Sequence, residues 1–385
     1  MRPDVAIVGG GLVGRCLAWR ASRSGAHVVL YDSASSQGTN SAAWATAGMI
    51  APTTEALDAD VQIASMGNNS LKLWPQWLAE LPIPVFYRNT GTLLLWHGED
   101  AGEAVRAQNM LASRQAQSRV QCLENSQIAE VEPELGTRFS HVLHVPCEAQ
   151  IDNRDFLKAV GLALEEAGVE CHWETALEDG SLPDSGIVVD CRGMGAKCDL
   201  RNLRGVRGEI VRLQAPEIEL NHMLRLLHPR YPVYIVPRAD GKLVVGATTI
   251  ESEDRSPASV RGALELLTSA YSILPALAEA RILEFNTQVR PALPDNLPAI
   301  QFDREQNVLR INGLYRHGFL LTPTIVEEVL GLLSGQSSGR WPCLDVNCSV
   351  PSTSFAQITG TRDAPNDARE FQFALKYIFG TGHQE

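Results

Sequence analysis

Long apolar runs, clustered cysteines and an excess of positive charge are all missing from this chain, and each absence excludes a class of protein. No apolar run approaches the roughly 20 residues of a membrane-spanning helix, so we expect no membrane span. The net charge is −12, and no basic patch carries interleaved aromatics, which argues against a nucleic-acid partner. The cysteines form no C-x-x-C pair and no histidine cluster accompanies them, so no metal site is expected.

The chain also enters its first strand pattern directly, without a charged and then apolar leader before it. We therefore expect a cytoplasmic location, with reduced thiols rather than a disulfide framework. A hydrophobic content of 44% and a charged content of 20% are typical of a soluble globular protein. The length of 385 residues indicates two domains, or one domain with large insertions.

The most informative segment lies at the N-terminus, where a strand, a glycine turn, a helix, a second strand and an acid come one after another. The apolar run 4–8 leads into a G-x-G-x-x-G at 9–14, a helical stretch extends to about Ser24, and a strand at 27–31 ends on Asp32. Gly9 makes the tight turn, Gly11 lets the backbone approach a pyrophosphate, and Gly14 lets the helix pack on the strand. The helix N-terminus donates N–H groups to the phosphates, and the acid accepts from ribose hydroxyls. The pattern predicts an adenine dinucleotide, either NAD or FAD.

Two later segments favour a large cofactor. Residues 33–51 are rich in Ser, Ala, Gly and Thr, which favours backbone wrapped closely around a ligand over a flexible loop. A second α/β passage places a helix over 154–167, a strand over 169–173 and another strand over 186–191. Small residues come next at 192–196 and suit close backbone approach to the same ligand.

Apolar periodicity predicts the remaining elements. The predicted helices cover 60–82, 100–135, 257–272 and 323–334. The predicted strands cover 90–96, 234–238, 243–248 and 308–311. Pro75 is expected to kink or interrupt the first of these helices, and Asp240-Gly241 predicts a hairpin turn. The tail has one amphipathic candidate helix at 368–379, for which we expect only a packing or oligomer contact.

The segments after the glycine turn favour FAD over NAD. NAD dehydrogenases often continue in repeated short β-α units. Here a long small-residue loop comes next, and the chain returns at 186–196 and again at 312–320. A second G-x-G-x-x-G for a nicotinamide is absent, so a flavin reduced directly by its organic substrate is the better hypothesis. An NAD-dependent dehydrogenase remains the alternative.

Motifs further along the chain make a resemblance specific. They are Tyr-Ile-Val-Pro-Arg at 234–238, Gly-Lys-Leu-Val-Val-Gly-Ala-Thr at 241–248, Arg-Pro at 290–291 with Asp-Asn-Leu-Pro at 295–298, Tyr-Arg-His-Gly-Phe-Leu-Leu-Thr-Pro at 315–323, and Ala-Gly-Met-Ile-Ala-Pro at 47–52. Together they resemble the glycine oxidases of the D-amino-acid oxidase superfamily. The resemblance covers about residues 4–335 and leaves the C-terminal tail unmatched.

The resemblance implies an α/β fold with a Rossmann-like FAD-binding domain and a discontinuous, strand-rich substrate domain built on an antiparallel sheet. The FAD-binding domain is expected over 1–85, 140–204 and 281–335. The substrate domain is expected over 86–139 and 205–280, and the tail over 336–385.

The resemblance also implies substrate-side residues. Arg290 would bind the substrate carboxylate, because a guanidinium forms a planar bidentate pair with it. Tyr234 would donate its hydroxyl to the same carboxylate, and Arg316 would be a second substrate-side arginine. Each of the three could instead serve only structure. His317 is disfavoured as a catalytic base, because the matched family has no histidine there.

The residues implied to contact the cofactor, a noncovalently bound FAD, come from five separate segments. They are Gly9, Gly11, Leu12, Val13, Gly14, Asp32, Ser33, Ser41, Ala47, Gly48, Met49, Leu177, Gly193, Gly313, Leu314, Tyr315, Arg316, His317, Gly318, Phe319 and Leu320.

The implied reaction is the oxidative deamination of a small amino acid such as glycine, sarcosine or a small D-amino acid. A hydride would pass to flavin N5, the imine would hydrolyse, and molecular oxygen would be the acceptor that yields hydrogen peroxide. No side-chain base is required, and the imine would feed thiazole synthesis for thiamine. The alternatives are an amino- or imino-acid dehydrogenase with another acceptor, and a flavin-binding protein without turnover. A homo-oligomer is expected only because such assemblies are common.

Overall fold

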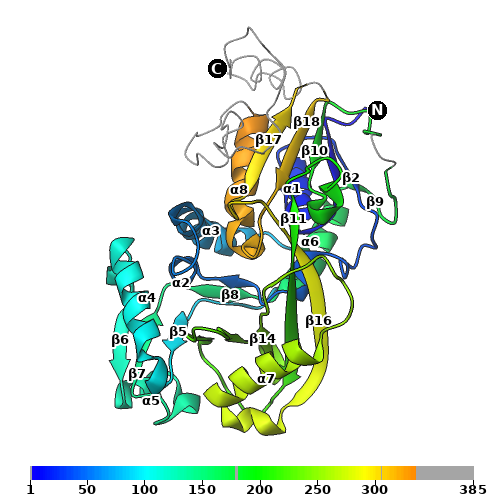
Figure 1. The fold of residues 1–385 in the computed structure, drawn as a ribbon. Coiled ribbons are helices and arrows are strands. Elements are labelled where there is room, and N and C mark those ends of the chain that lie inside the picture. The colour runs from blue at the N-terminus through cyan, green and yellow to red at the C-terminus, as the bar shows by residue number, and fades with distance from the viewer. Residues whose placement is uncertain (1, 178–180, 305, 335–385) are drawn as a thin grey trace.

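A six-stranded sheet carries the N-terminal glycine turn. The computed structural model describes residues 2–177, 181–304 and 306–334. In it the strand order is β17-β18-β10-β1-β2-β9, with five parallel strands and an antiparallel β17 at one edge (Figure 1). The strands are β1 (Val5–Val8), β2 (Val28–Tyr31), β9 (Glu170–His172), β10 (Ile187–Asp190), β17 (Ala299–Asp303) and β18 (Val308–Asn312). All four positions of β1 are buried, as expected for a parallel strand covered on both faces.

Four helices build the core beside this sheet. They are α1 (Leu12–Arg23), α3 (Val61–Ala79), α6 (Asn153–Glu166) and α8 (Gly318–Leu333). The aromatic side chains at the centre of this core are fully buried. Trp74 of α3 packs edge to face against Phe156 of α6, with 4.9 Å between the ring centroids. This packing fixes the N-terminal ends of α1 and α8, which both face the glycine turn region.

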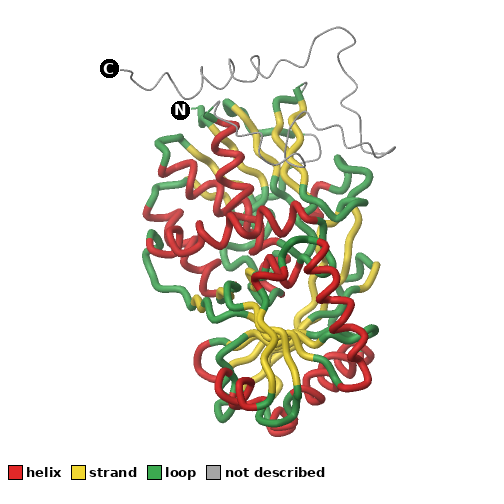
Figure 2. Tube along the Cα trace, turned by 90° about the vertical axis from the view of Figure 1, so that its left-hand side faces the viewer, coloured by secondary structure: helices red, strands yellow, loops and turns green. Residues whose placement is uncertain are grey.

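A nine-stranded, mostly antiparallel sheet forms the other half of the molecule, as Figure 2 shows below the first sheet. Its strands are β5 (Thr92–Leu95), β6 (Gln121–Glu124), β7 (His141–Val145), β11 (Arg204–Gln214), β12 (Met223–Leu226), β13 (Tyr234–Pro237), β14 (Lys242–Gly246), β15 (Ile250–Glu251) and β16 (Arg281–Ala292). The long strands β11 and β16 pair along their length and run from one half to the other (Figure 1).

Smaller elements complete the fold. The helices α4 (Ala101–Ser113), α5 (Ser126–Val131) and α7 (Val260–Ile273) belong to the second half. A three-stranded sheet, β3 (Met49–Ile50), β4 (Tyr87–Arg88) and β8 (Ala149–Ile151), joins the halves, and the short helix α2 (Pro52–Glu55) comes directly after β3. The 3₁₀ turns are η1 (Ala42–Ala45), η2 (Gly98–Asp100), η3 (Gln117–Arg119), η4 (Pro133–Leu135), η5 (Gly193–Ala196), η6 (Ala239–Gly241) and η7 (Pro275–Glu279).

The predicted fold class is confirmed, while some element boundaries were wrong. The continuous helix over 100–135 is broken, because residues 121–124 form β6 and pair with β7. Pro75 lies inside α3 without ending it. The last helix begins at Gly318 rather than 323. The candidate helix at 368–379 lies outside the described residues.

A side chain from another helix explains why Pro323 is tolerated inside α8. Proline has no N–H, so the carbonyl of Phe319 lacks its usual partner four residues on. Trp74 Nε1 donates to that carbonyl at 3.0 Å instead. The tertiary bond replaces the missing helical one and lets α8 start five residues earlier than the proline suggested.

The predicted domain boundaries remain a proposal. Two strands that fall inside the segments predicted for the FAD-binding domain, β7 and β16, pair with strands of the nine-stranded sheet. Within the described part of the chain, no helix is both long enough and apolar enough to span a bilayer.

Candidate functional site

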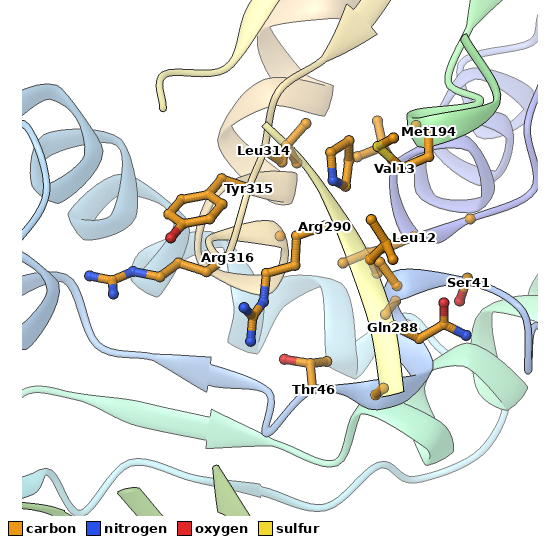
Figure 3. Close-up of a pocket in the computed structure, with 18 of the residues that line it drawn as sticks. Leu12, Val13, Ser41, Thr46, Met194, Gln288, Arg290, Leu314, Tyr315 and Arg316 are labelled. Atoms are coloured by element: carbon orange, nitrogen blue, oxygen red, sulfur yellow. The ribbon is translucent and has the colours of Figure 1, made fainter. Parts of the chain in front are cut away.

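A cavity of about 770 Å³ lies where the two sheets meet, within the range of ligand sites. Its walls come from the glycine turn, the loop 33–49, strand β16 and the loop that precedes α8 (Figure 3). All predicted site residues line it except Gly14, Gly48 and Gly313. These three glycines instead pack against neighbouring chain segments, where a Cβ would lie within 3 Å of another residue. The structure therefore brings together residues that lie as far apart in the sequence as Gly9 and Leu320.

The glycine turn has the geometry expected for a pyrophosphate. A Cβ at Gly14 would lie 1.9 Å from the carbonyl oxygen of Gly9, so α1 packs on β1 only with glycine there. A Cβ at Gly11 would meet no described atom within 4 Å. The space beside Gly11, at the N-terminus of α1, is thus free for a phosphate. Asp32 at the end of β2 accepts from the backbone N–H of Gly10 and, at 2.6 Å, from that of Ala34.

Arg15 is a supporting residue that the sequence analysis missed. Its side chain is fully buried, Nε donates to the carbonyl of Gly10 at 2.7 Å, and Nη2 donates to that of Ser36 at 2.8 Å. The guanidinium also lies 4.6 Å from the ring centre of Trp173. Burial lowers its pKa, against the raising effect of Asp32. An arginine within an otherwise apolar helix face was the only sequence sign of this role.

The cavity wall also fits a group larger than a nucleotide. Thr287 Oγ1 on β16 is buried in the wall and has no hydrogen-bond partner among the described residues. Ser41 and Met49 of the small-residue loop also line the cavity, and Ser41 lies near Gln288 of β16 (Figure 3). An elongated ligand would run from Asp32 past Gly11 to the loop before α8. The size of the cavity and this unpartnered polar atom in its wall fit FAD.

The wall formed by η1 is held from behind by α6. Asn153, the first residue of that helix, donates through Nδ2 to the carbonyls of Ala43 at 2.7 Å and Trp44 at 2.9 Å. Its Oδ1 accepts from Nη2 of Arg212 at 2.8 Å. The loop is therefore fixed to both halves of the molecule, because Arg212 belongs to β11.

Replacing Asn153 by alanine should weaken cofactor binding without unfolding the protein. The variant loses two hydrogen bonds that order η1, so we expect the Kd for FAD to rise about tenfold. Fluorescence titration of the apoprotein with FAD measures it. Asn109→Ala, on the exposed face of α4, is the control. An unchanged Kd in the Asn153 variant would show that the loop is ordered by other contacts.

Arg290 and Tyr234 both line the cavity and lie close enough for each to affect the pKa of the other. Arg290 Nη1 donates to the carbonyl of Thr248 at 3.1 Å, and its other N–H groups have no hydrogen-bond partner among the described residues. A Cβ at Gly208 would lie 2.1 Å from Arg290 Nη2, so β11 offers glycine where the guanidinium packs. Burial lowers the pKa of Arg290, with Tyr234 opposing. Burial raises the pKa of Tyr234, with Arg290 opposing, so the hydroxyl keeps its proton.

Arg316 points away from Arg290 (Figure 3) and is already paired. Its Nη2 lies 3.0 Å from Glu55 Oε2 and 3.5 Å from Asp58 Oδ2. His317 Nδ1 lies 3.3 Å from the same Glu55 oxygen. Burial lowers the pKa of His317 to about 4, against the effect of Glu55, which leaves the imidazole neutral at pH 7. The two carboxylates were missed, because an acidic pair after the loop 47–52 has no distinctive spacing.

A second buried carboxylate, Glu148, holds α2 in place. It accepts from the N–H and Oγ1 of Thr54, both at 2.6 Å, and from Oγ1 of Thr92 at 2.5 Å. Burial raises the pKa of Glu148 from 4.5 to about 7, against the lowering effect of these hydrogen bonds. Glu55 comes directly after Thr54 in α2. By holding Thr54, Glu148 therefore helps to set the position of the Glu55 carboxylate in the cavity.

Glu148 should make stability depend on pH. The folded state binds its proton more tightly than the unfolded state, so this stabilisation is complete below about pH 4.5 and is lost as the pH rises through 7. As the pH rises from 5 to 8, the unfolding free energy of wild type should therefore fall by on the order of 2–3 kcal/mol relative to that of Glu148→Gln. Thermal unfolding across that range measures the difference, with the exposed Glu217→Gln as control. Parallel curves for wild type and Glu148→Gln would contradict the prediction.

No group of three or more His, Cys, Asp or Glu among the described residues is arranged to hold a metal ion.

The fold and the cavity define the class of protein. The family described as FAD dependent oxidoreductase matches residues 4–330. The chain belongs to this family, the D-amino-acid oxidase superfamily, whose cofactor is FAD.

Relatives give the type within the family. A putative thiamine biosynthesis oxidoreductase, ThiO, from Rhizobium etli is 39% identical over 84% of this chain and 94% of the relative. Glycine oxidase from Geobacillus kaustophilus is 26% identical over 84% of this chain and 90% of the relative. The crystal structure of that organism's glycine oxidase has a TM-score of 0.75 at 25% identity and covers 86% of this chain and 94% of that chain. The chain is therefore an FAD-dependent oxidoreductase of the glycine oxidase and ThiO type, as the sequence motifs indicated.

Proposed function

We propose that the protein oxidises the C–N bond of a small amino acid, with glycine as the preferred substrate and with sarcosine and small D-amino acids also accepted. The observation that carries this proposal is the placement of Arg290. Its guanidinium is fixed by Thr248 and lies in the same cavity as the flavin-side residues Met49 and Leu314. A carboxylate bound there would be held beside the cofactor.

Arg290 would orient the substrate through two N–H groups that bind the carboxylate side by side. Tyr234 would donate its hydroxyl to the same carboxylate, because its raised pKa keeps the phenol protonated. With the carboxylate held at two points, the α-carbon can occupy only a narrow range of positions. Positioning of this kind supplies much of the rate when no side-chain base acts.

Other residues would hold the cofactor and exclude water. Asp32 and the N-terminus of α1 would bind its adenosine and pyrophosphate parts. The backbone of Leu314 to Leu320 would line the flavin on one side, and Ala47 and Met49 would line it on the other. FAD bound there would supply a two-electron hydride acceptor at N5, and its reoxidation by molecular oxygen would yield hydrogen peroxide.

The names of the relatives suggest a role for the product. A ThiO-type enzyme would deliver the imine of glycine to thiazole synthesis in thiamine biosynthesis. The predictions of a cytoplasmic location and of a homo-oligomer stay predictions.

An anaerobic titration of the purified protein tests the function. Glycine, sarcosine, D-alanine and D-proline are added in turn while the flavin absorption band is monitored. Bleaching by glycine or sarcosine supports the proposal, and stoichiometric peroxide after air is admitted supports oxygen as acceptor. Bleaching with weak peroxide but fast dye reduction indicates a dehydrogenase. A flavin that no amino acid reduces overturns the proposal and favours a flavin-binding protein without turnover.

A further inference from the structure

Two carboxylates face the substrate end of the cavity from the segment after β3. Glu55 closes α2, and Asp58 lies three residues further on; we call them the acidic pair. Both line the cavity together with Arg225 and Arg316. Glu55 is well buried, with 16% of its side chain exposed, whereas Asp58 is 42% exposed.

The acidic pair is shared between two arginines that come from different elements. Arg316, on the loop before α8, lies 3.0 Å from Glu55. Arg225, on β12, lies 3.6 Å from Glu55 and 2.5 Å from Asp58. Each arginine thus contacts both carboxylates. Arg290 makes no ion pair with either carboxylate among the described residues.

The charges in this part of the cavity therefore leave one positive charge that a bound anion can neutralise. Three arginines (Arg225, Arg290 and Arg316) stand against two carboxylates, which leaves one positive charge, and His317 is neutral. Burial would raise the pKa of Glu55, but the neighbouring cations, Arg316 first, lower it well below its usual value, so Glu55 is ionised at neutral pH. Arg255 also lines the cavity, but it is exposed and screened by water.

We propose that Glu55, supported by Asp58, sets substrate specificity by neutralising Arg316 and Arg225, so that the cavity accepts a single carboxylate at Arg290 and rejects substrates with a second anionic group. The inference rests on the proposed function, since it takes Arg290 as the carboxylate ligand. It assigns Arg316 to the acidic pair rather than to the substrate. A second carboxylate would meet the charge of Glu55 and would find, among the described residues that line the buried part of the cavity, no cation other than Arg290 without an acidic partner.

Inert carboxylates test the specificity directly in the FAD-loaded protein. Acetate carries one carboxylate, while malonate and succinate carry two at different spacings. Their Kd values are measured from the perturbation of the flavin absorption spectrum. Wild type should bind acetate and bind both dicarboxylates more weakly. Glu55→Gln removes one negative charge and releases Arg316, so its affinity for at least one dicarboxylate should rise about tenfold or more, with acetate changed much less.

Three further variants separate charge from structure. Glu55→Asp keeps the charge and should keep the preference for acetate. In the double variant Glu55→Gln with Arg316→Met, the net charge of this group returns to the wild-type value of one positive charge. Its affinity for dicarboxylates should therefore be close to that of wild type. Glu80→Gln is the matched control, because Glu80 pairs with Arg20 and Arg23 outside the cavity. If Glu55→Gln does not retain FAD, Asp58→Asn provides the same test with a smaller expected gain.

The outcomes distinguish this inference from the function on which it rests. Acetate binding in wild type with no gain in either Glu55→Gln or Asp58→Asn overturns the inference alone. A gain that survives Arg316→Met also overturns it, because the released arginine would then not be the cause. Failure of acetate to bind wild type, together with failure of every amino acid to reduce the flavin, overturns both.

Discussion

Arg290→Ala should lower kcat/KM for the amino-acid substrate by about 10²- to 10³-fold while leaving FAD bound. The variant removes the buried charged partner of the substrate carboxylate, a loss of about 2–5 kcal/mol. FAD affinity should change little, because Arg290 reaches the cavity from β16 at the substrate end. Steady-state peroxide formation and the Kd for FAD measure the two effects separately.

Two variants sharpen the Arg290 test. Arg290→Lys keeps the charge but loses the planar pair of N–H groups, so it should fall between wild type and the alanine variant. Arg281→Ala, an exposed arginine at the start of the same strand, should behave as wild type. If Arg290→Ala kept near-normal kcat/KM, the carboxylate would have to bind elsewhere, and Arg316 would be the next residue to replace.

Gly14→Val should prevent formation of the yellow holoprotein. A Cβ there would lie 1.9 Å from the carbonyl oxygen of Gly9, and neither backbone can move without separating α1 from β1. Overpacking of this severity costs more than about 3 kcal/mol. The amount of soluble protein, its FAD content and its thermal unfolding midpoint measure the effect.

Gly11→Ala is the matched comparison within the same motif. Its Cβ would meet no described atom, so the fold should keep its unfolding free energy to within about 0.5 kcal/mol. The methyl group would instead enter the space for the pyrophosphate and raise the Kd for FAD. If Gly14→Val kept its unfolding free energy, as is expected of Gly11→Ala, and lost only FAD affinity, Gly14 would be needed for the cofactor rather than for packing.

The parts of the site that were predictable from the sequence are those with fixed local geometry. The strand, glycine turn and acid at Asp32 must be contiguous, so a single segment reveals them. The motifs around Tyr234, Arg290 and Arg316 were found by resemblance, and the cavity contains all three. The family and its cofactor are confirmed, whereas the roles of these three side chains remain proposals.

The parts that were missed depend on contacts between distant segments. Glu55 gains its role from Arg225 and Arg316, and nothing in its sequence neighbours indicates that pairing. Asn153 likewise begins an ordinary helix, and only the tertiary structure brings its amide to the carbonyls of η1. The break in the helix predicted over 100–135 has the same origin, since the pairing of β6 with β7 outweighed local helical preference.

The long ladder between β11 and β16, which has one register shift between Arg212 and Leu213, bears on how substrate enters. Residues 204–214 pair with residues 281–292 from one half of the molecule to the other, and Arg290 and Gly208 lie on this ladder. A hinge that opened the two halves would have to break these backbone hydrogen bonds, at a cost far above thermal energy. We therefore expect the two halves to keep their relative position when substrate binds. Entry and exit are left to side chains and surface loops, and the overall dimensions in solution should be the same with and without substrate.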